Sequence, residues 1–282
     1  MGLSFLHIPE ADLFKSEPPP QWFGNGPNEA DAKWTNANWL KSRFHFSFAE
    51  YRNPKNACFG ALRVMNDDLV QGERGFGMHP HRDVEIVTYV VDGKLTHCDS
   101  MGTRETLGRG SVQFMTAGTG IRHSEHNLES APLRFIQIWI TPRAHGLQPT
   151  YGGFDGATPA AQQARSNALV QLVGDNEQPS HGAAPVQISA DCAMHVAELE
   201  AGRAVEFALG KRRQAYLLCV EGALAAAGGE ATMKLVRHDA AEVRGEGTLQ
   251  LTARDGPAHV LLMEMAEGAG GRGPGKWPLH VG

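Results

Sequence analysis

Short apolar runs separated by turns characterise most of the chain. At 43–48 the sequence RFHFSF has an apolar residue at every second position, which is the alternation of a half-buried β-strand. No long segment after it in the first half of the chain has an apolar period of 3.6 residues, so amphipathic helices are not predicted there. The pattern predicts an all-β fold of short strands that form a barrel or sandwich. The other strand-like runs lie at 61–65, 84–91, 94–97, 111–114, 135–140, 169–173, 194–199, 215–220, 249–252 and 259–265.

Glycine and proline residues mark the ends of these runs. Asp92-Gly93 is the strongest hairpin signal in the chain, because this dipeptide supplies the positive φ angles of a type I′ turn. Between 142 and 159 several Pro and Gly residues interrupt the strand pattern, and 160–168 is predicted as a short helix. The segments VVDGKL at 90–95 and CVEGAL at 219–224 resemble each other, which indicates two copies of one β-barrel unit.

These signals divide the chain into five predicted parts. Residues 1–42 are expected to be an irregular segment that packs on the barrels, because three consecutive prolines at 18–20 disfavour regular strand pairing. The remaining parts are an N-terminal barrel at 43–153, a linker at 154–168, a C-terminal barrel at 169–265 and a Gly-rich tail at 266–282.

The composition is that of a folded soluble protein. The 282 residues include 26 Lys+Arg and 31 Asp+Glu, and the net charge of −5 argues against direct binding of a nucleic-acid backbone. No apolar run approaches the roughly 20 residues that cross a membrane, and the N-terminal sequence has no secretory signal pattern. The four cysteines are far apart without a C-x-x-C pair, which favours free thiols. We therefore expect a cytoplasmic protein, or a nuclear one in a eukaryote, that contacts neither membranes nor nucleic acid directly.

Two short motifs carry metal-binding residue types. His79-Pro80-His81 puts two imidazoles at positions i and i+2, and His123-Ser124-Glu125 repeats the spacing with an imidazole and a carboxylate. Residues two apart lie on the same face of a strand, so the four side chains converge if both segments meet inside one barrel. In a chain of this length with 13 histidines, one H-x-H pair is unremarkable by chance, and the second motif makes the set informative. Three imidazoles and one carboxylate suit a divalent transition metal with positions left open for a substrate or O₂.

The sequence around these motifs resembles the pirin family. The family hallmark H-P-H-R-x-x-E-x-x-T-Y matches 79–89, the second hallmark M-(T/S)-A-G-x-G-I-x-H-S-E matches 115–125, and the resemblance covers 43–153. It implies a bicupin, which is a chain of two cupin β-barrels with a few short helices. It also implies one mononuclear metal in the N-terminal barrel, with Fe(II) favoured and Mn, Ni, Cu or Zn as alternatives. The ligands that the resemblance implies are His79, His81, His123 and Glu125.

A second acidic residue competes for the ligand position. The general cupin motif H-x-H-x(3,4)-E nominates Glu85, which an unbroken strand would point to the same side as His79 and His81. The resemblance favours Glu125 as the ligand. Glu85 is then expected either to orient an imidazole or to be a surface carboxylate.

The predicted C-terminal barrel has no equivalent motif. H-x-H occurs nowhere in 165–282, although five of the histidines lie there. We therefore expect this barrel to lack a metal site and to have a structural or partner-binding role.

The resemblance implies two functions of different classes. The one that we favour is a quercetin 2,3-dioxygenase, which opens a flavonol with O₂ while Glu125 or Glu85 accepts the proton of the flavonol hydroxyl. The alternative is an iron-binding, redox-sensitive transcriptional co-regulator, which binds a protein partner without turnover. The pocket for an aromatic substrate is predicted to be lined by Phe76, Met78, Phe114 and Met115.

Overall fold

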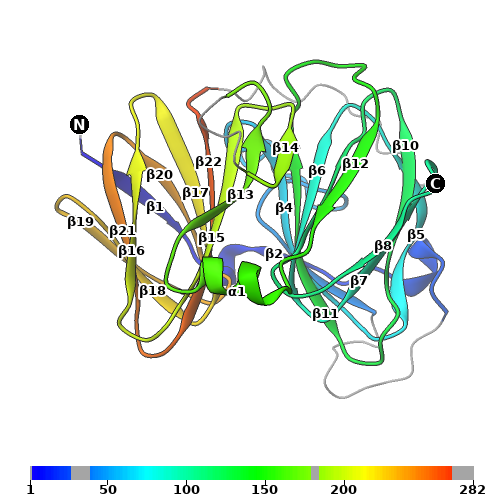
Figure 1. Ribbon diagram of the computed structural model, residues 1–282, viewed down its shortest axis with the longest axis horizontal. Coiled ribbons are helices and arrows are strands. Elements are labelled where there is room, and N and C mark those ends of the chain that lie inside the picture. The colour runs from blue at the N-terminus through cyan, green and yellow to red at the C-terminus, as the bar shows by residue number, and fades with distance from the viewer. Residues whose placement is uncertain (1, 27–38, 179–183, 269–282) are drawn as a thin grey trace. The chain divides into compact units, whose positions relative to one another are not determined.

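The structure is a computed structural model that describes residues 2–26, 39–178 and 184–268 (Figure 1). Within these residues the chain divides into two compact units. The N-terminal barrel comprises the described residues of Phe14–Cys58 and Leu62–Ala157. The C-terminal barrel comprises those of Met1–Leu13, Phe59–Ala61 and Thr158–Gly271. The predicted tail at 266–282 lies outside the described residues from 269 onward, as does 27–38 of the predicted N-terminal segment.

The N-terminal barrel consists of two antiparallel sheets. Its strands are β2 (Phe14–Ser16), β3 (Leu40–Phe44), β4 (Leu62–Val70), β5 (Arg74–His81), β6 (Glu85–Asp92), β7 (Leu95–Asp99), β8 (Arg104–Leu107), β9 (Val112–Thr116), β10 (Ile121–Asn127), β11 (Leu133–Ile140) and β12 (Thr150–Phe154). The larger sheet has the order β12-β9-β6-β11-β4-β3-β2 and the smaller one the order β5-β10-β7-β8. A short 3-10 helix, η2 (Pro20–Phe23), contacts β5. The central strand β6 is buried on both faces over Glu85–Val91, which explains the continuous apolar run in the sequence.

The C-terminal barrel repeats this organisation. Its strands are β1 (Ser4–Ile8), β13 (Val170–Asp175), β14 (Val186–Ile188), β15 (Cys192–Leu199), β16 (Ala204–Leu209), β17 (Arg213–Glu221), β18 (Ala223–Gly228), β19 (Ala231–Val236), β20 (Ala240–Arg244), β21 (Gly247–Ala253) and β22 (Ala258–Ala266). The sheets have the orders β1-β20-β17-β22-β15-β13-β14 and β16-β21-β18-β19. The predicted helix is α1 (Pro159–Arg165), and the 3-10 helix η1 is Glu10–Asp12. The prediction of an all-β fold with two barrels is confirmed.

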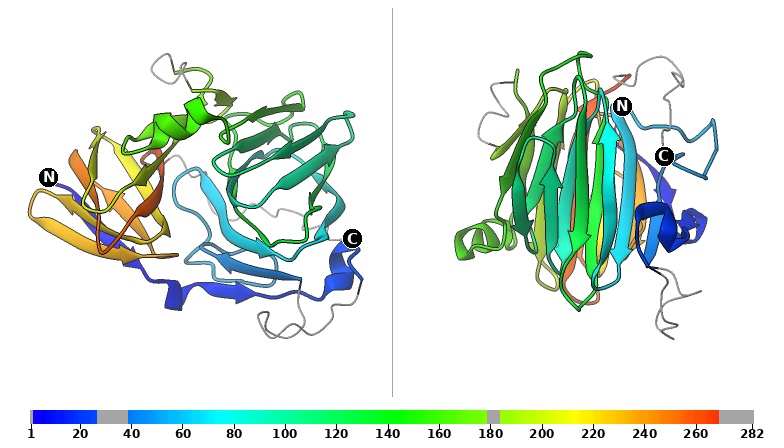
Figure 2. Two further views of the ribbon diagram at one scale, coloured as in Figure 1. Left: turned by 60° about the horizontal axis from the view of Figure 1, so that its bottom comes forward. Right: turned by 90° about the vertical axis from the view of Figure 1, so that its right-hand side faces the viewer.

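Regular strands begin earlier than the sequence predicted. β1 pairs with β20 from the other end of the chain, with Ser4 opposite Arg244, and β2 pairs with β3 (Figure 2). The prediction of an irregular segment at 1–42 is therefore wrong for these two strands. β1 has no apolar alternation because it lies at a sheet edge with most of its side chains exposed, whereas Leu3 beside it packs into the core of the C-terminal barrel.

The predicted hairpin at Asp92-Gly93 is also wrong. β6 pairs with β9 and β11, whereas β7 pairs with β8 and β10 in the other sheet. Gly93 does adopt a positive φ of 79°, and a Cβ there would lie 2.8 Å from the carbonyl oxygen of Pro132. The dipeptide makes the tight bend that its sequence predicts, but the bend carries the chain from one sheet to the other.

The run at 43–48 is a strand only at its start. β3 ends at Phe44, and the following residues form a packed loop in which Ser47 Oγ accepts a hydrogen bond from the backbone N–H of Asn53 at 2.8 Å. The rings of Phe44 and Phe48 contact each other edge to face, with their centroids 5.3 Å apart. The alternation here arises from loop side chains that pack on the barrel.

No helix in the part of the chain that the structure describes is long and apolar enough to cross a membrane.

The N-terminal barrel contains a buried acidic group on β4. Burial, together with the charges of Asp67 and Glu125, raises the pKa of Asp68 to about 8, although Ser42 Oγ donates a hydrogen bond to its carboxyl group. The folded protein therefore keeps this proton up to about pH 8, whereas the unfolded chain releases it near the ordinary value of 3.8. Because the folded state binds more protons in this window, the contribution of Asp68 to stability decreases as pH rises from about 4 to 8.

Asp68→Asn is expected to remove this pH dependence, since the amide keeps an acceptor for Ser42 and carries no charge. Relative to the parent protein, the variant should be more stable by roughly 5 kcal/mol at pH 9, since four pKa units are worth about 1.4 kcal/mol each, and nearly unchanged at pH 4.5. Urea unfolding of both proteins at the two pH values measures the difference. Asp255→Asn, at a carboxylate with 75% side-chain exposure, is the control and should change stability by less than about 0.5 kcal/mol at either pH. Equal stability changes for Asp68→Asn at both pH values would contradict the assignment.

Candidate metal centre

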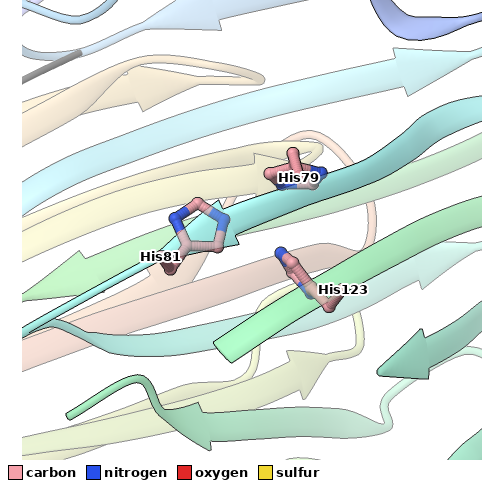
Figure 3. Close-up of side chains that lie close together, drawn as sticks. All are labelled: His79, His81 and His123. Carbon is pink, nitrogen blue, oxygen red and sulfur yellow. The ribbon is translucent and has the colours of Figure 1, made fainter. Parts of the chain in front are cut away.

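Two neighbouring strands of the smaller sheet bring three histidines together. β5 pairs antiparallel with β10, and this register places His79 directly opposite His123. His81, two residues along β5, faces the same side. One ring nitrogen from each of His79, His81 and His123 lies within 4.8 Å of the other two, and the ring centroids are 4.5–4.8 Å apart (Figure 3). The two sequence motifs therefore meet on neighbouring strands, which is the condition under which their side chains were expected to converge.

The environment keeps these imidazoles neutral. Burial lowers the pKa of His79, lowers that of His81 to about 3, and lowers that of His123 well below the ordinary value. The charges that the other histidines would carry act in the same direction on His81 and His123. A neutral imidazole keeps one lone pair, which is the form that binds a metal.

The hydrogen bonds indicate which nitrogen is available on each ring. His79 Nδ1 lies 2.7 Å from the carbonyl oxygen of Gly77, an acceptor, so Nδ1 carries the proton and Nε2 has the lone pair. Within the described residues, His81 Nε2 and His123 Nε2 are buried without a hydrogen-bond partner. Buried polar atoms without partners are rare and costly in native proteins. This donor set fits a divalent transition metal, which these nitrogens would hold.

Glu125 lies next to this cluster in the barrel interior. Its Oε2 is 4.0 Å from His123 Nε2, and its side chain is 3% exposed. Thr88 Oγ1 donates to Oε1 at 3.1 Å, and Gln137 Nε2 donates to Oε2 at 3.4 Å. Burial raises the pKa of Glu125 to about 7 despite the hydrogen bond from Thr88. Thr88 and Gln137 hold the carboxyl group in place, and neither was predicted to belong to the site, although Thr88 lies in the first hallmark motif.

A β-bulge in β5 decides which neighbours face the interior. His123 is opposite His79, but Glu125 is opposite Phe76, so β5 contains an extra residue between these pairs. The bulge turns Phe76 inward, where its ring contacts Trp39 and Phe135. Met78 directly precedes the inward-facing His79 on β5, so its side chain points outward. It is 47% exposed and does not join the predicted pocket.

Glu85 lies on the other side of the larger sheet. β6 runs without a register shift from Glu85 to Tyr89, and its Thr88 points inward to Glu125, so Glu85 points to the opposite face. Thr116 Oγ1 donates a hydrogen bond to Glu85 Oε2 at 2.8 Å. Glu85 was expected to point to the same side as His79 and His81. This expectation fails because the strand is broken between His81 and Glu85, where Asp83 has a positive φ of 51°.

The two remaining pocket candidates lie on opposite faces of β9. Met115 packs with Ile86 and Ile121 in a cluster that also includes Trp139, and the Trp139 ring lies edge-on to His81 with centroids 4.8 Å apart. Phe114 faces the other way, against Gly152, where a Cβ would lie 2.3 Å from its ring. The structure thus places Met115 on the side of the histidines and Phe114 away from them.

Comparison with known proteins identifies the family. The family model Pirin matches residues 28–140, and the model of the quercetinase C-terminal cupin domain matches 178–265. A relative from Pseudomonas aeruginosa is 42% identical over 231 residues, which are 82% of this chain and 94% of the relative. The chain belongs to the pirin family. The name of the P. aeruginosa relative proposes, without asserting, quercetin 2,3-dioxygenase activity.

Two further proteins that resemble this chain have an activity or a metal in their names. The quercetin 2,3-dioxygenase of Escherichia coli K12 is 51% identical over 117 residues, which are 41% of this chain and 51% of that enzyme. The bacterial pirin YhhW of E. coli, solved in complex with nickel(II), superimposes with a TM-score of 0.74 at 28% identity, over 94% of this chain and 100% of YhhW. The bicupin fold predicted from the family resemblance is thereby confirmed.

Proposed function

We propose that this pirin is a metal-dependent dioxygenase that opens quercetin or a related flavonol with O₂. The observation that carries the proposal is the convergence of three neutral imidazoles, two of which bury an Nε2 atom that has no hydrogen-bond partner among the described residues. The substrate class comes from the names of the relatives. Fe(II) is the metal that we favour, and Mn, Ni, Cu or Zn would suit the same nitrogen ligands. The nickel complex of YhhW supports a divalent metal of this series.

The chain's own residues have separate roles in this proposal. His79, His81 and His123 would hold the metal, which when bound supplies Lewis acidity to the flavonol hydroxyl and a common place for the two reactants. Glu125, the fourth ligand that the family resemblance implies, is the acidic residue of the site, and its carboxyl group, whose Oε2 lies 4.0 Å from His123 Nε2, would accept the hydroxyl proton. Thr88 and Gln137 fix its orientation.

The apolar wall beside the histidines has the remaining role. Trp139, Met115 and Phe76 present aromatic and thioether surface to the interior, which suits a flat aromatic substrate and excludes water from the reacting groups. Glu85 is not part of the proposal, because it lies on the opposite face of β6.

Oxygen consumption and CO release with quercetin test the proposal. The metal-free protein is loaded separately with Fe(II), Mn(II), Ni(II), Cu(II) and Zn(II), and turnover is expected with at least one metal. His79→Ala should lower kcat/KM at least 100-fold, while His145→Ala, at an imidazole with 70% side-chain exposure, should leave it unchanged. If the protein binds one metal per chain and no metal supports turnover, the enzyme proposal is wrong. The metal-dependent co-regulator then becomes the function to test.

A further inference from the structure

A chain of buried polar groups lies behind one of the proposed ligands. In β7, which pairs with β10, Asp99 is opposite His123 and His97 is opposite Glu125. His123 Nδ1 lies 3.4 Å from His97 Nδ1, and His97 Nε2 lies 3.2 Å from Asp99 Oδ2. The side chains of His97 and Asp99 are 2% and 0% exposed. The three groups therefore form one continuous hydrogen-bonded chain inside the barrel.

The direction of each hydrogen bond follows from Asp99. Its Oδ1 accepts the backbone N–H groups of Met101 at 2.8 Å and Thr103 at 3.1 Å, the Thr103 side chain also hydrogen-bonds the carboxylate, and Oδ2 faces His97. A carboxylate can only accept, so His97 Nε2 donates. Burial lowers the pKa of His97, and the Nδ1 atom of the neutral ring therefore has the lone pair. That lone pair accepts the Nδ1–H of His123, and the lone pair of His123 is therefore on Nε2.

The ring of His97 is also fixed by packing. Tyr151 stacks on it with a centroid distance of 4.5 Å and an interplanar angle of 20°. The hydroxyl of Tyr151 donates to Glu105 Oε2 at 2.7 Å, which holds the stacked ring in place. His97 therefore presents Nδ1 to His123 in one orientation.

We propose that Asp99 and His97 are positioning residues that hold His123 as its Nδ1–H tautomer, with Nε2 open toward the metal position. This proposal rests on the proposed metal site and adds two residues that do not touch the metal. His123 is otherwise free to adopt the Nε2–H tautomer, in which the nitrogen that faces His79 and His81 carries a proton and binds no metal.

Asp99→Asn is the sharpest test, because it reverses the direction of the hydrogen bonds from residue 99 through His97 to His123 while the side chain keeps its shape. The amide oxygen of the substituted side chain keeps the two backbone N–H groups of Met101 and Thr103, so its NH₂ group points at His97 Nε2 and can only donate. His97 must then accept at Nε2 and donate from Nδ1, and His123 becomes the Nε2–H tautomer. An analogous Asp-to-Asn change that imposes the wrong histidine tautomer is known from the serine-protease triad.

The first measurement uses the metal-free protein. Long-range ¹⁵N–¹H correlation of the histidine side chains distinguishes the two tautomers, and His123→Ala and His97→Phe assign the signals. The parent should show His123 as Nδ1–H and His97 as Nε2–H, and Asp99→Asn should invert both. A parent that already has His123 as Nε2–H, or a variant with unchanged tautomers, would overturn the proposal.

The second measurement is the affinity for Ni(II) or Zn(II) by titration calorimetry. Asp99→Asn should weaken binding about 10- to 100-fold. Glu129→Gln is the control, because it makes the same change of charge in the same barrel at a carboxylate with 52% side-chain exposure, and it should stay within about twofold of the parent. His97→Phe keeps an aromatic ring against Tyr151 and removes both nitrogens, so it should also weaken binding and leave His123 without a single tautomer. It serves as the test if Asp99→Asn does not fold.

The outcomes separate this proposal from the metal site itself. A parent protein that binds no divalent metal contradicts the proposed function, whereas the tautomers of the metal-free protein still decide whether the hydrogen-bonded chain exists. A parent that binds metal while Asp99→Asn and His97→Phe bind equally well contradicts only the positioning role.

Discussion

Replacing His123 with alanine is expected to abolish stoichiometric metal binding and flavonol turnover together. His123 Nε2 is a fully buried nitrogen at the centre of the cluster, with the rings of His79 and His81 on one side and His97 on the other. Loss of a residue that only orients a metal ligand costs roughly 10- to 100-fold in affinity, so loss of the ligand should cost more than about 100-fold. Elemental content after dialysis and titration calorimetry with Ni(II) measure the effect.

His126→Ala is the matched control for this variant. His126 lies on the same strand, three residues further along, and its half-buried ring packs against Gly75 and not against the histidine cluster. Its replacement should change metal affinity by less than about threefold. Tight, stoichiometric binding by His123→Ala would show that the metal is held elsewhere, and an equal loss in both variants would point to damage of β10 as a whole.

The site was easier to predict than the strands that carry it. His79, His81, His123 and Glu125 follow from two spaced motifs and the pirin resemblance, yet neither β5 nor β10 belongs to the predicted strand-like runs. RGFGMHPH and IRHSEHN have few apolar residues at alternating positions, because their inward positions carry metal-binding and hydrogen-bonding groups. A functional strand breaks the local pattern that identifies an ordinary one.

The errors of the sequence interpretation concern which segments meet. Asp92-Gly93 correctly predicts a bend, but a local signal does not say whether the next strand pairs with the previous one or joins another sheet. Glu85 is an even number of residues from His79, but an even spacing places two side chains on the same face only along one unbroken strand. His97 and Asp99 gave no signal at all, since their relation to His123 exists only through the register of β7 with β10.

Replacement of Arg134 is expected to have the largest destabilising effect. Arg134 on β11 donates from Nε to Asp67 Oδ1 at 2.8 Å and from Nη2 to Asp67 Oδ2 at 2.7 Å, and the two side chains are 4% and 1% exposed. Arg134→Met should therefore destabilise the protein by about 3–5 kcal/mol, because it leaves the Asp67 carboxylate buried without its counter-charge.

The double variant separates the loss of the cation from the loss of packing. Asp67→Asn with Arg134→Met removes both charges, and it should recover much of the stability lost in the single variant, since a buried ion pair contributes less than the cost of breaking it. Lys94→Met removes one partner of an exposed pair with Glu129, 59% and 52% exposed, and should cost less than about 1 kcal/mol. Urea unfolding of the parent and the three variants gives the free energies.

A cost below about 1 kcal/mol for Arg134→Met would mean that water or a rearranged neighbour compensates Asp67. A double variant no more stable than the single one would mean that packing by the arginine side chain, and not its charge, stabilises this part of the barrel.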